Sequence, residues 1–398
     1  MKVYIITNSP FPYGMAPVKR KICYAKALLS QGVDCKVVVF SRTEQKGKPT
    51  PNISSKGVFE GVPFEYLGGS NVRSSINLIA KLQTVYLEFY LLFYLLKKLE
   101  KGDVVLEYAH DKFTNFMNAV IRVTHLKGAK FVRELCELPF GKGKEKKSDI
   151  IARKRILTNQ FPKYDGVIAI SDSLVDLSRK YMGENKSILK VPILVEYEKY
   201  DMEDKSEETQ QPYIFHSGTL TEQKDGLLGM IEAFGLAQSQ LKRPVRFICT
   251  GNKDKSPCKK EIDVLIDKYN LGNELVFTGY LSDDELRGYL QKASVVIINK
   301  AVNQQNTYCF STKLGEYMAA GKAIIITKVG EAMNWLTDGE DALIIPPCEN
   351  DMLAEAIIRL LNDDVLHQHL GKNARKTCKQ CFDYRVWGNS LKEYFETI

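Results

Sequence analysis

The segment Asn303–Lys322 combines residue types and spacing that suit the binding of a nucleotide. Ser311 is a good N-cap for the helix that follows, and a helix N-terminus beside Lys313 favours a bound phosphate. Glu316 falls about one turn into that helix, where its carboxylate can accept hydrogen bonds from two neighbouring hydroxyls, such as those of a ribose. A solvated acid on the helix surface would also explain Glu316. The candidate donor-binding residues of this segment are Ser311, Thr312, Lys313, Leu314 and Glu316.

A second segment, His216–Gly226, follows an apolar strand-like run and opens a helix near Asp225. Its small residues permit a ligand to approach the backbone closely, and Lys224 is a point charge suited to a diphosphate. A solvated lysine at a helix start is the competing interpretation. The candidates here are Ser217, Gly218, Thr219 and Lys224.

The first half of the chain offers weaker candidates. The loop Asn8–Arg20 joins a strand-like run to a helix, and its Gly14 and Arg20 could approach a phosphate, although a plain strand-to-helix turn has the same pattern. Gly14 stands alone, so this is not the three-glycine dinucleotide turn of a dehydrogenase. Three residues that follow strand-like runs are candidate catalytic groups: His110, Glu134 and Glu137. A lone histidine in such a place is more often structural.

The composition of the chain favours some classes of binding partner and disfavours others. The net charge of +8 fits an ordinary basic protein or a surface that meets phosphates or anionic lipid. Nucleic acid is disfavoured, because the basic residues are spread along the chain without an RNA-binding or zinc-finger signature. The nine scattered cysteines suggest reduced thiols. No Asp-x-Asp pair follows a strand, and Asp283-Asp284 looks like a helix cap, so we expect neither a metal nor a cofactor.

Two series of short apolar runs alternate with helical patterns, which is typical of parallel sheets covered on both faces. The predicted fold is α/β, with two doubly wound, Rossmann-like domains facing a central cleft. The N-terminal residues Met1–Thr7 look like a buried strand rather than a signal peptide. The expected divisions are an acceptor-side domain over residues 1–195, a polar linker over 196–212, a nucleotide-sugar domain over 213–380, and a C-terminal helix over 381–398 that could pack back on the first domain.

Segment Ser75–Lys101 is the most apolar helical stretch of the chain. Lys81, Gln83 and Glu88 interrupt it, and its apolar core is too short to span a bilayer. Burial against the first sheet is the favoured interpretation. Contact with a membrane surface and docking of a partner are the alternatives.

The residues of Asn303–Lys322 resemble the donor motif of glycosyltransferase family 4, whose members have the two-domain GT-B fold. In that family an acid and a second Glu, separated by seven residues, precede a helix that ends in Ala-x-Gly, as Glu316–Gly321 does here. The resemblance covers essentially the whole chain and is strongest in Tyr213–Asn362. It implies that Glu316 binds the nucleotide ribose and that the Gly14 loop faces the donor phosphates.

This chain departs from the family pattern at several positions. Tyr308 stands where the first acid of the motif contacts the donor sugar, and Thr219 stands where an Arg is common. Lys224 is retained, and Lys313 could replace the missing charge. Glu134 or Glu137 occupies the place of a frequent His. The Ser-Gly-Thr-Leu and Ser-Thr-Lys-Leu sequences resemble a subset of the family found among enzymes of surface polysaccharide assembly.

The resemblance implies a retaining, metal-independent hexosyltransferase. Its donor would be a nucleotide-diphosphate sugar, with UDP preferred, and its acceptor a saccharide or lipid-linked saccharide in cell-surface polysaccharide synthesis. The expected location is the cytoplasm, at the inner face of the membrane if the surface contact exists. Lys224, Lys313 and Arg20 would stabilise the leaving diphosphate. The alternatives are a non-catalytic protein that binds a sugar nucleotide and, less favoured, a nucleotide-sugar 2-epimerase.

Overall fold

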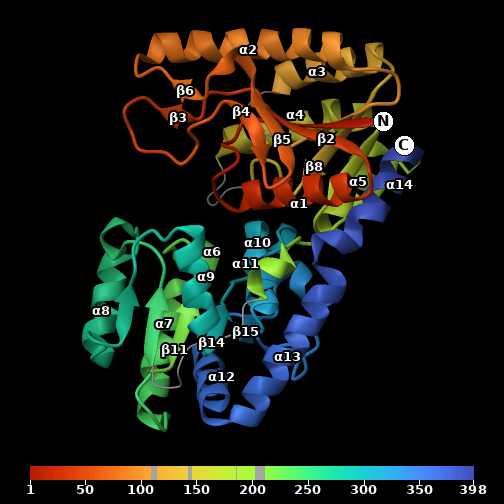
Figure 1. Cartoon of the computed structure of the whole chain (residues 1–398). Helices are drawn as coiled ribbons and strands as arrows, with labels where there is room; N and C mark the ends of the chain where they lie inside the picture. Colours follow the sequence, from red (N-terminus) through yellow and green to blue (C-terminus); the bar gives the residue numbers. More distant parts are fainter. Residues whose placement is uncertain (109–113, 142–145, 185, 202–210) are drawn as a thin grey trace. The chain divides into compact units, whose positions relative to one another are not determined.

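The computed structural model describes residues 1–108, 114–141, 146–184, 186–201 and 211–398. His110, one of the candidate catalytic residues, lies outside these ranges. The chain forms two compact units, one made of Met1–Leu194 with Tyr384–Ile398 and the other of Val195–Asp383. Each unit has its own sheet and helices (Figure 1).

The N-terminal unit is built on an eight-stranded sheet with the order β10-β9-β8-β7-β1-β2-β5-β4. All neighbouring strands are parallel except β4 and β5. Continuous apolar runs such as Val37–Val39 form these strands because both faces of a parallel sheet are buried. The strands are β1 (Lys2–Thr7), β2 (Asp34–Val39), β4 (Lys56–Phe59), β5 (Val62–Tyr66), β7 (Val104–Glu107), β8 (Lys130–Leu135), β9 (Gly166–Ala169) and β10 (Ser187–Lys190).

Helices surround this sheet, and a small ladder of β3 (Glu44–Gln45) and β6 (Val72–Arg73) lies apart from it. The helices are α1 (Ala16–Ser30), α2 (Asn77–Lys98), α3 (Thr114–Leu126), α4 (Lys147–Asn159), α5 (Asp172–Met182) and the C-terminal α14 (Gly388–Thr397).

Helix α14 completes the N-terminal unit although it comes last in the chain. A Cβ on Gly388 would lie 2.7 Å from the carbonyl oxygen of Ala27, so only glycine permits this close packing of α14 on α1. The hydroxyl of Tyr394 donates to the carbonyls of Val167 and Ser187, at 3.0 Å in each case. The side chains of Leu391 and Tyr394 are part of the core of this unit.

Helix α2 differs from the favoured sequence interpretation. Only one side of it packs on the unit, through Ala80, Leu87, Leu91, Tyr94 and Leu95. Its other sides carry a long series of exposed apolar residues. The sequence pattern could not show this, because a helix that is apolar all round has no polar face to mark the solvent side.

The C-terminal unit has a six-stranded, fully parallel sheet with the order β13-β12-β11-β14-β15-β16. The strands are β11 (Tyr213–His216), β12 (Arg246–Cys249), β13 (Leu275–Phe277), β14 (Val295–Ile298), β15 (Ala323–Thr327) and β16 (Leu343–Ile345). The helices are α6 (Glu222–Asp225), α7 (Leu227–Ala237), α8 (Lys259–Tyr269), α9 (Asp283–Lys292), α10 (Gln304–Tyr308), α11 (Thr312–Ala319), α12 (Asn350–Asn362) and α13 (Asp364–Cys381).

The strand order of this sheet reverses between β11 and β14. The chain runs outward from β11 through β12 to β13 and then crosses to β14 on the other side of β11. Such a switch point leaves a crevice at the carboxyl ends of the two strands, where ligands bind in doubly wound sheets.

The first part of the predicted linker packs within the C-terminal unit. Residues Tyr197–Tyr200 form a short 3-10 helix, η4. The guanidinium of Arg375 on α13 donates to the hydroxyl of Tyr197 at 2.9 Å and to the carbonyl of Tyr200 at 3.2 Å. This segment is therefore a structured part of the unit up to the described limit at Asp201.

Candidate functional site

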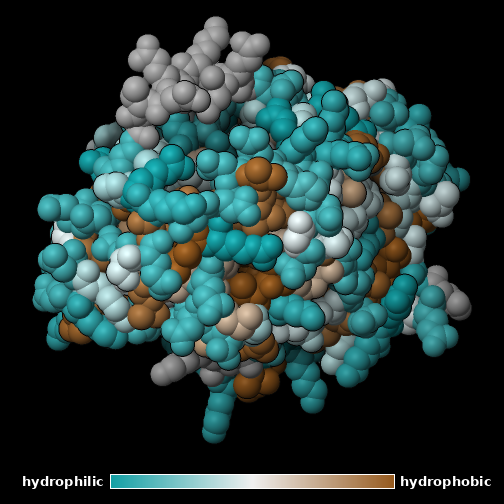
Figure 2. Space-filling view, turned by 90° about the horizontal axis from the view of Figure 1, so that it is seen from below, coloured by the Kyte–Doolittle hydropathy of each residue, from teal (hydrophilic) through white to brown (hydrophobic). Residues whose placement is uncertain are grey.

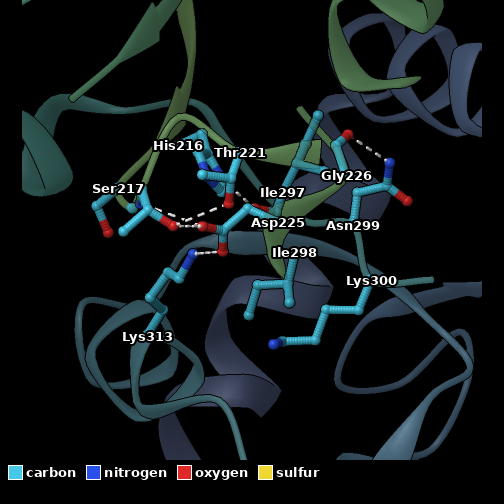
Figure 3. Close-up of polar contacts among 12 residues, drawn as sticks. His216, Ser217, Thr221, Asp225, Gly226, Ile297, Ile298, Asn299, Lys300 and Lys313 are labelled. Atoms are coloured by element: carbon cyan, nitrogen blue, oxygen red, sulfur yellow. Dashed lines mark hydrogen bonds and ion pairs between the residues drawn. The ribbon is translucent and has the colours of Figure 1, made fainter. Parts of the chain in front are cut away.

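An ion pair between Asp225 and Lys313 stands at the switch point (Figure 3). Asp225 ends α6 and its side chain is 2% exposed, while Lys313 comes from the first turn of α11 and is 16% exposed. Asp225 Oδ2 also accepts from Thr219 Oγ1 at 2.6 Å and from the Thr219 amide at 3.1 Å. Burial alone would raise the pKa of the Asp225 carboxyl, but Lys313 and these hydrogen bonds hold it below its usual range.

Positive charge accumulates around this pair. Burial lowers the pKa of Lys313 below its usual value, and repulsion from Lys300 and Lys224 adds to that effect, although Asp225 opposes it. Lys300 lies two residues after β14, is 7% exposed, and donates to Asn306 Oδ1 at 3.1 Å. Lys224 lies on α6 and is exposed. With one buried acid among three lysines, the site carries a net positive charge that suits a phosphate ligand.

The side chains of this cluster leave no room for a side chain at Gly218. A Cβ at this position would lie 2.5 Å from Lys313 Nζ, 2.9 Å from His216 Nε2 and 3.1 Å from Asp225 Oδ2. Any side chain would therefore push into the ion pair.

His216 presents an unused acceptor to the same space. Its ring is fully buried, and Nδ1 lies 3.1 Å from the carbonyl oxygen of Ile297, which can only accept, so Nδ1 carries the proton. Nε2 has no hydrogen-bond partner among the described residues. Burial and the charge of Lys313 lower the pKa of His216 to about 4, so the ring is neutral near pH 7.

The backbone of residues 217–219 behaves differently from the sequence prediction. The amide of Ser217 donates to Tyr317 Oη at 2.8 Å, that of Gly218 to Thr250 Oγ1 at 2.9 Å, and that of Thr219 to Asp225. These three N–H groups are thus occupied by the protein itself. Hydrogen bonds to an anion in this arrangement would have to come from the lysines and from the start of α11.

Helix α11 begins as predicted, with Ser311 as its N-cap and Thr312 as its first residue. The Ser311 side chain makes no capping hydrogen bond, so it does not occupy the first-turn N–H groups. Leu314 is fully buried, which makes it a packing residue rather than one whose side chain touches a ligand. A donor contact from Leu314 would therefore come from its backbone, and this role stays a prediction.

Glu316 is half-buried on α11, and this helix packs against η4. Burial raises the pKa of the Tyr200 hydroxyl well above its usual value, and the nearby negative charge of Glu316 adds to this shift. The carboxylate therefore lies close to η4. Tyr308, which stands in place of an acid, is the half-buried last residue of α10.

In the N-terminal unit, the predicted Arg20 and Glu134 form a buried pair with each other. Arg20 Nε donates to Glu134 Oε1 at 2.6 Å, and the side chains are 3% and 1% exposed. The other two guanidinium nitrogens of Arg20 donate to Tyr24 Oη and to the carbonyls of Val191 and Pro192. Both side chains are thus interior, and the roles expected of them, donor binding for Arg20 and catalysis for Glu134, stay predictions.

The remaining candidates of this unit are on its surface. Gly14 is exposed in the loop before α1, and a Cβ there would lie 2.7 Å from Val18 Cγ2. Glu137 is exposed after β8. Within the ranges that the structure describes, no three His, Cys, Asp or Glu side chains gather in a way that could hold a metal ion.

Sequence reasoning missed Asp225, His216 and Lys300 as members of the site. Asp225 was interpreted only as the start of a helix, and His216 as the end of a strand. The available signal was that His216 ends β11 and Lys300 follows β14 by two residues, because parallel strands bring their carboxyl ends to one edge. Asp225 lies further on, at the end of α6.

Comparisons with known proteins agree with this architecture. Residues 198–377 match the family described as "Glycosyl transferases group 1". An uncharacterized glycosyltransferase of Methanocaldococcus jannaschii is 26% identical over 240 residues, which are 59% of this chain and 58% of that protein. The alpha-D-kanosaminyltransferase of Streptomyces kanamyceticus is 21% identical over 50% of this chain and 48% of its own length. The chain thus spans about half the length of these curated relatives.

Solved structures match along the whole chain. A glycosyltransferase from Rickettsia africae has a TM-score of 0.70 at 16% identity, covering 99% of this chain and 98% of its own. HepE from Anabaena, solved in complex with UDP-glucose, has a TM-score of 0.70 at 15% identity and full coverage of both chains. The predicted fold class is confirmed: the two parallel-sheet units have the GT-B fold of glycosyltransferases. The chain is similar to the group 1 glycosyl transferases over residues 198–377, and the curated relatives that it resembles are glycosyltransferases.

Proposed function

We propose that this protein is a retaining, metal-independent glycosyltransferase that moves a hexose-type sugar from a UDP-sugar to a saccharide or lipid-linked saccharide acceptor. The observation that carries the proposal is the cluster of Lys224, Lys300 and Lys313 around Asp225 at the switch point of the C-terminal sheet. The UDP and UDP-glucose complexes of HepE support the choice of base. A lipopolysaccharide 1,2-N-acetylglucosaminetransferase of Salmonella typhimurium, 24% identical over 46% of this chain, supports a cell-surface saccharide acceptor.

The lysines supply the electrostatic part of the proposed reaction. As the bond between the anomeric carbon and the β-phosphate oxygen breaks, negative charge grows on the diphosphate, and fixed ammonium groups stabilise it. Asp225 keeps Lys313 in place and leaves two of its three N–H groups for other partners. This arrangement needs no divalent cation to offset the leaving-group charge.

In the proposed reaction the anomeric configuration of the sugar is retained, because the acceptor attacks the anomeric carbon on the face that the diphosphate leaves. The acceptor hydroxyl forms the new C–O bond there and gives its proton to an oxygen of the departing phosphate. Glu316 is proposed to accept hydrogen bonds from the ribose hydroxyls, since it lies one turn into α11. Exposed Glu137 stays a candidate for the acceptor side.

Calorimetric titration of the full chain with UDP, GDP and ADP in the presence of a chelator tests the donor. We expect UDP to bind most tightly, and Glu316→Gln to weaken it by about tenfold, the equivalent of losing about 1.4 kcal/mol of hydrogen bonding. Glu355→Gln, at an exposed position on α12, is the matched control and should bind normally. Unchanged affinity in Glu316→Gln would remove the ribose role.

Transfer itself is tested with UDP-sugars and a mixture of saccharide and lipid-linked acceptors. Lys224→Ala should slow transfer by about 10²-fold, as expected for the loss of one electrostatic donor. Lys260→Ala, an exposed lysine on α8, should be unaffected. Activity that a chelator abolishes and magnesium restores would refute the metal-independent mechanism.

A non-catalytic protein that binds a sugar nucleotide is the second candidate, because Tyr308 and Thr219 replace the acid and the Arg of the related motif. Slow hydrolysis of the UDP-sugar without an acceptor would favour the transferase. Tight binding without hydrolysis or transfer would favour the second candidate. The proposed location of the transferase is the cytoplasm, next to the inner face of the membrane.

A further inference from the structure

Helix α2 exposes more apolar surface than a soluble unit requires. Two series of side chains, each at the spacing of one helix face, point away from the body of the unit. The exposed apolar residues of this outer face of α2 are Leu78, Ile79, Leu82, Val85, Tyr86, Phe89, Tyr90, Phe93 and Leu96. Phe89 is 68% exposed and Phe93 is 62% exposed. A continuous apolar patch of this kind marks a docking surface.

Packing holds this helix along the unit rather than free of it. In Figure 1, α2 runs the length of one side of the N-terminal unit, with α3 beside it. On the side of α2 that packs on the unit, its residues Leu87, Leu91 and Leu95 are almost completely buried. Within the described ranges, α2 is long and apolar enough by length and composition to cross a bilayer, which differs from the expectation that its apolar core is too short. Of its apolar window, 28% is buried. A helix anchored by one face can lie in a membrane surface, not across the bilayer.

The face shown in Figure 2 offers a contrast. Hydrophobic residues there form groups among hydrophilic ones, as on an ordinary soluble surface. Along α2 the exposed apolar residues follow one another over five turns, interrupted by exposed Lys81 and by half-buried Gln83, Thr84 and Glu88. Burial raises the pKa of Glu88, so this acid opposes contact with an apolar phase less than an exposed one would.

Cations stand at the end of this apolar face. The helix ends in Lys97 and Lys98, and together with Lys56 of β4 they line a cavity of about 290 Å³ that Tyr90 and Phe93 also border. None of these three lysines has an ion-pair partner in the part of the chain that the structure describes. Glu65, the acid of this cavity, is already engaged by Lys36 at 2.7 Å and by the hydroxyl of Tyr94.

We infer that the outer face of α2 docks the protein on an anionic lipid bilayer, with the cavity of Lys56, Lys97 and Lys98 receiving a lipid phosphate. Apolar and aromatic side chains followed directly by lysines match the boundary between acyl chains and anionic headgroups. A second copy packed with its α2 parallel would bring these lysines against one another, and a dimer through this face is an outcome of the test below. The inference does not depend on the proposed reaction.

Vesicle co-sedimentation of the full chain tests the inference. The wild type should bind vesicles of phosphatidylcholine and phosphatidylglycerol, and Phe89→Ser/Phe93→Ser should lower the partition coefficient at least about tenfold, because both rings leave water on docking. Both positions are exposed, so the fold is preserved. The matched control is Val264→Ser/Val365→Ser, which changes exposed apolar residues of the C-terminal unit and should bind like the wild type.

A second set of variants tests the contribution of the lysines to vesicle binding. Lys56→Gln/Lys97→Gln/Lys98→Gln should weaken binding to the anionic vesicles by about fivefold for each lysine and leave binding to pure phosphatidylcholine unchanged. Lys255→Gln/Lys260→Gln/Lys372→Gln has the same net charge and should bind normally. Millimolar inorganic phosphate should not displace the protein, whereas displacement would mean that the cavity binds free phosphate.

Two results would overturn the inference. One is a wild type that partitions no better than Phe89→Ser/Phe93→Ser. The other is sedimentation velocity showing a wild-type dimer that this variant converts to a monomer. UDP titration of the same variants separates this failure from that of the proposed function, since nucleotide affinity should be normal in all of them.

Discussion

The buried pair of Asp225 and Lys313 predicts a large, pH-dependent loss of stability in Asp225→Asn. The asparagine keeps the shape and can still accept from Thr219, but it leaves the Lys313 ammonium uncompensated in a site where it is 16% exposed. Removing one partner of a buried pair costs about 3–5 kcal/mol. We expect the free energy of unfolding of the C-terminal unit to fall by about 3 kcal/mol at pH 7, measured by urea denaturation.

The pH dependence gives this prediction its sharpest test. The pKa of Asp225 is depressed in the folded state, so its contribution is complete above the unfolded value of about 4 and is lost as the pH falls through the folded value. The difference between wild type and Asp225→Asn should therefore be constant from about pH 8 to pH 5 and shrink below about pH 4. The double variant Asp225→Asn/Lys313→Met, which removes both charges, should recover part of the loss. A difference below about 1 kcal/mol, or one that is independent of pH, would refute the reasoning.

Two further predictions concern crowded or buried groups. Gly218→Ala should weaken UDP binding in calorimetry by at least about tenfold, since its Cβ would lie 2.5 Å from Lys313 Nζ, and normal affinity would show that the lysine is not used. Lys21 is fully buried, donates to Thr7 Oγ1 at 3.0 Å, and has a pKa that burial lowers to about 7. Because the unfolded chain binds this proton more tightly, wild-type stability should rise between pH 7 and about pH 10 relative to Lys21→Met, and parallel stability curves in urea denaturation would contradict the assignment.

The strands and the two-sheet architecture could be predicted from the sequence because they depend on local patterns. Runs such as Val295–Ile298 are apolar at every position, which suits a strand buried on both faces. The helix start after Ser311 was also predicted correctly, although the Ser311 side chain makes no capping hydrogen bond. These features need no knowledge of distant partners.

Side-chain partners could not be predicted in the same way. Lys313 meets an acid 88 residues away, and Arg20 meets Glu134 across 114 residues, so their neutralisation is decided by the tertiary fold. The exposure of one face of α2 could not be predicted from the sequence for a related reason. Hydrophobicity alone does not distinguish a helix covered by protein from one covered by another apolar phase.

The return of α14 to the N-terminal unit has a consequence for synthesis of the chain. The core of that unit includes Leu391, Tyr394 and Phe395, which the ribosome adds only after the whole of Val195–Asp383. At about 5–20 residues per second, this delay is on the order of ten seconds or more. The C-terminal unit can fold as soon as its last helix emerges, while the N-terminal unit lacks these three core residues until α14 has been made. The first unit to be translated is therefore the last to be completed.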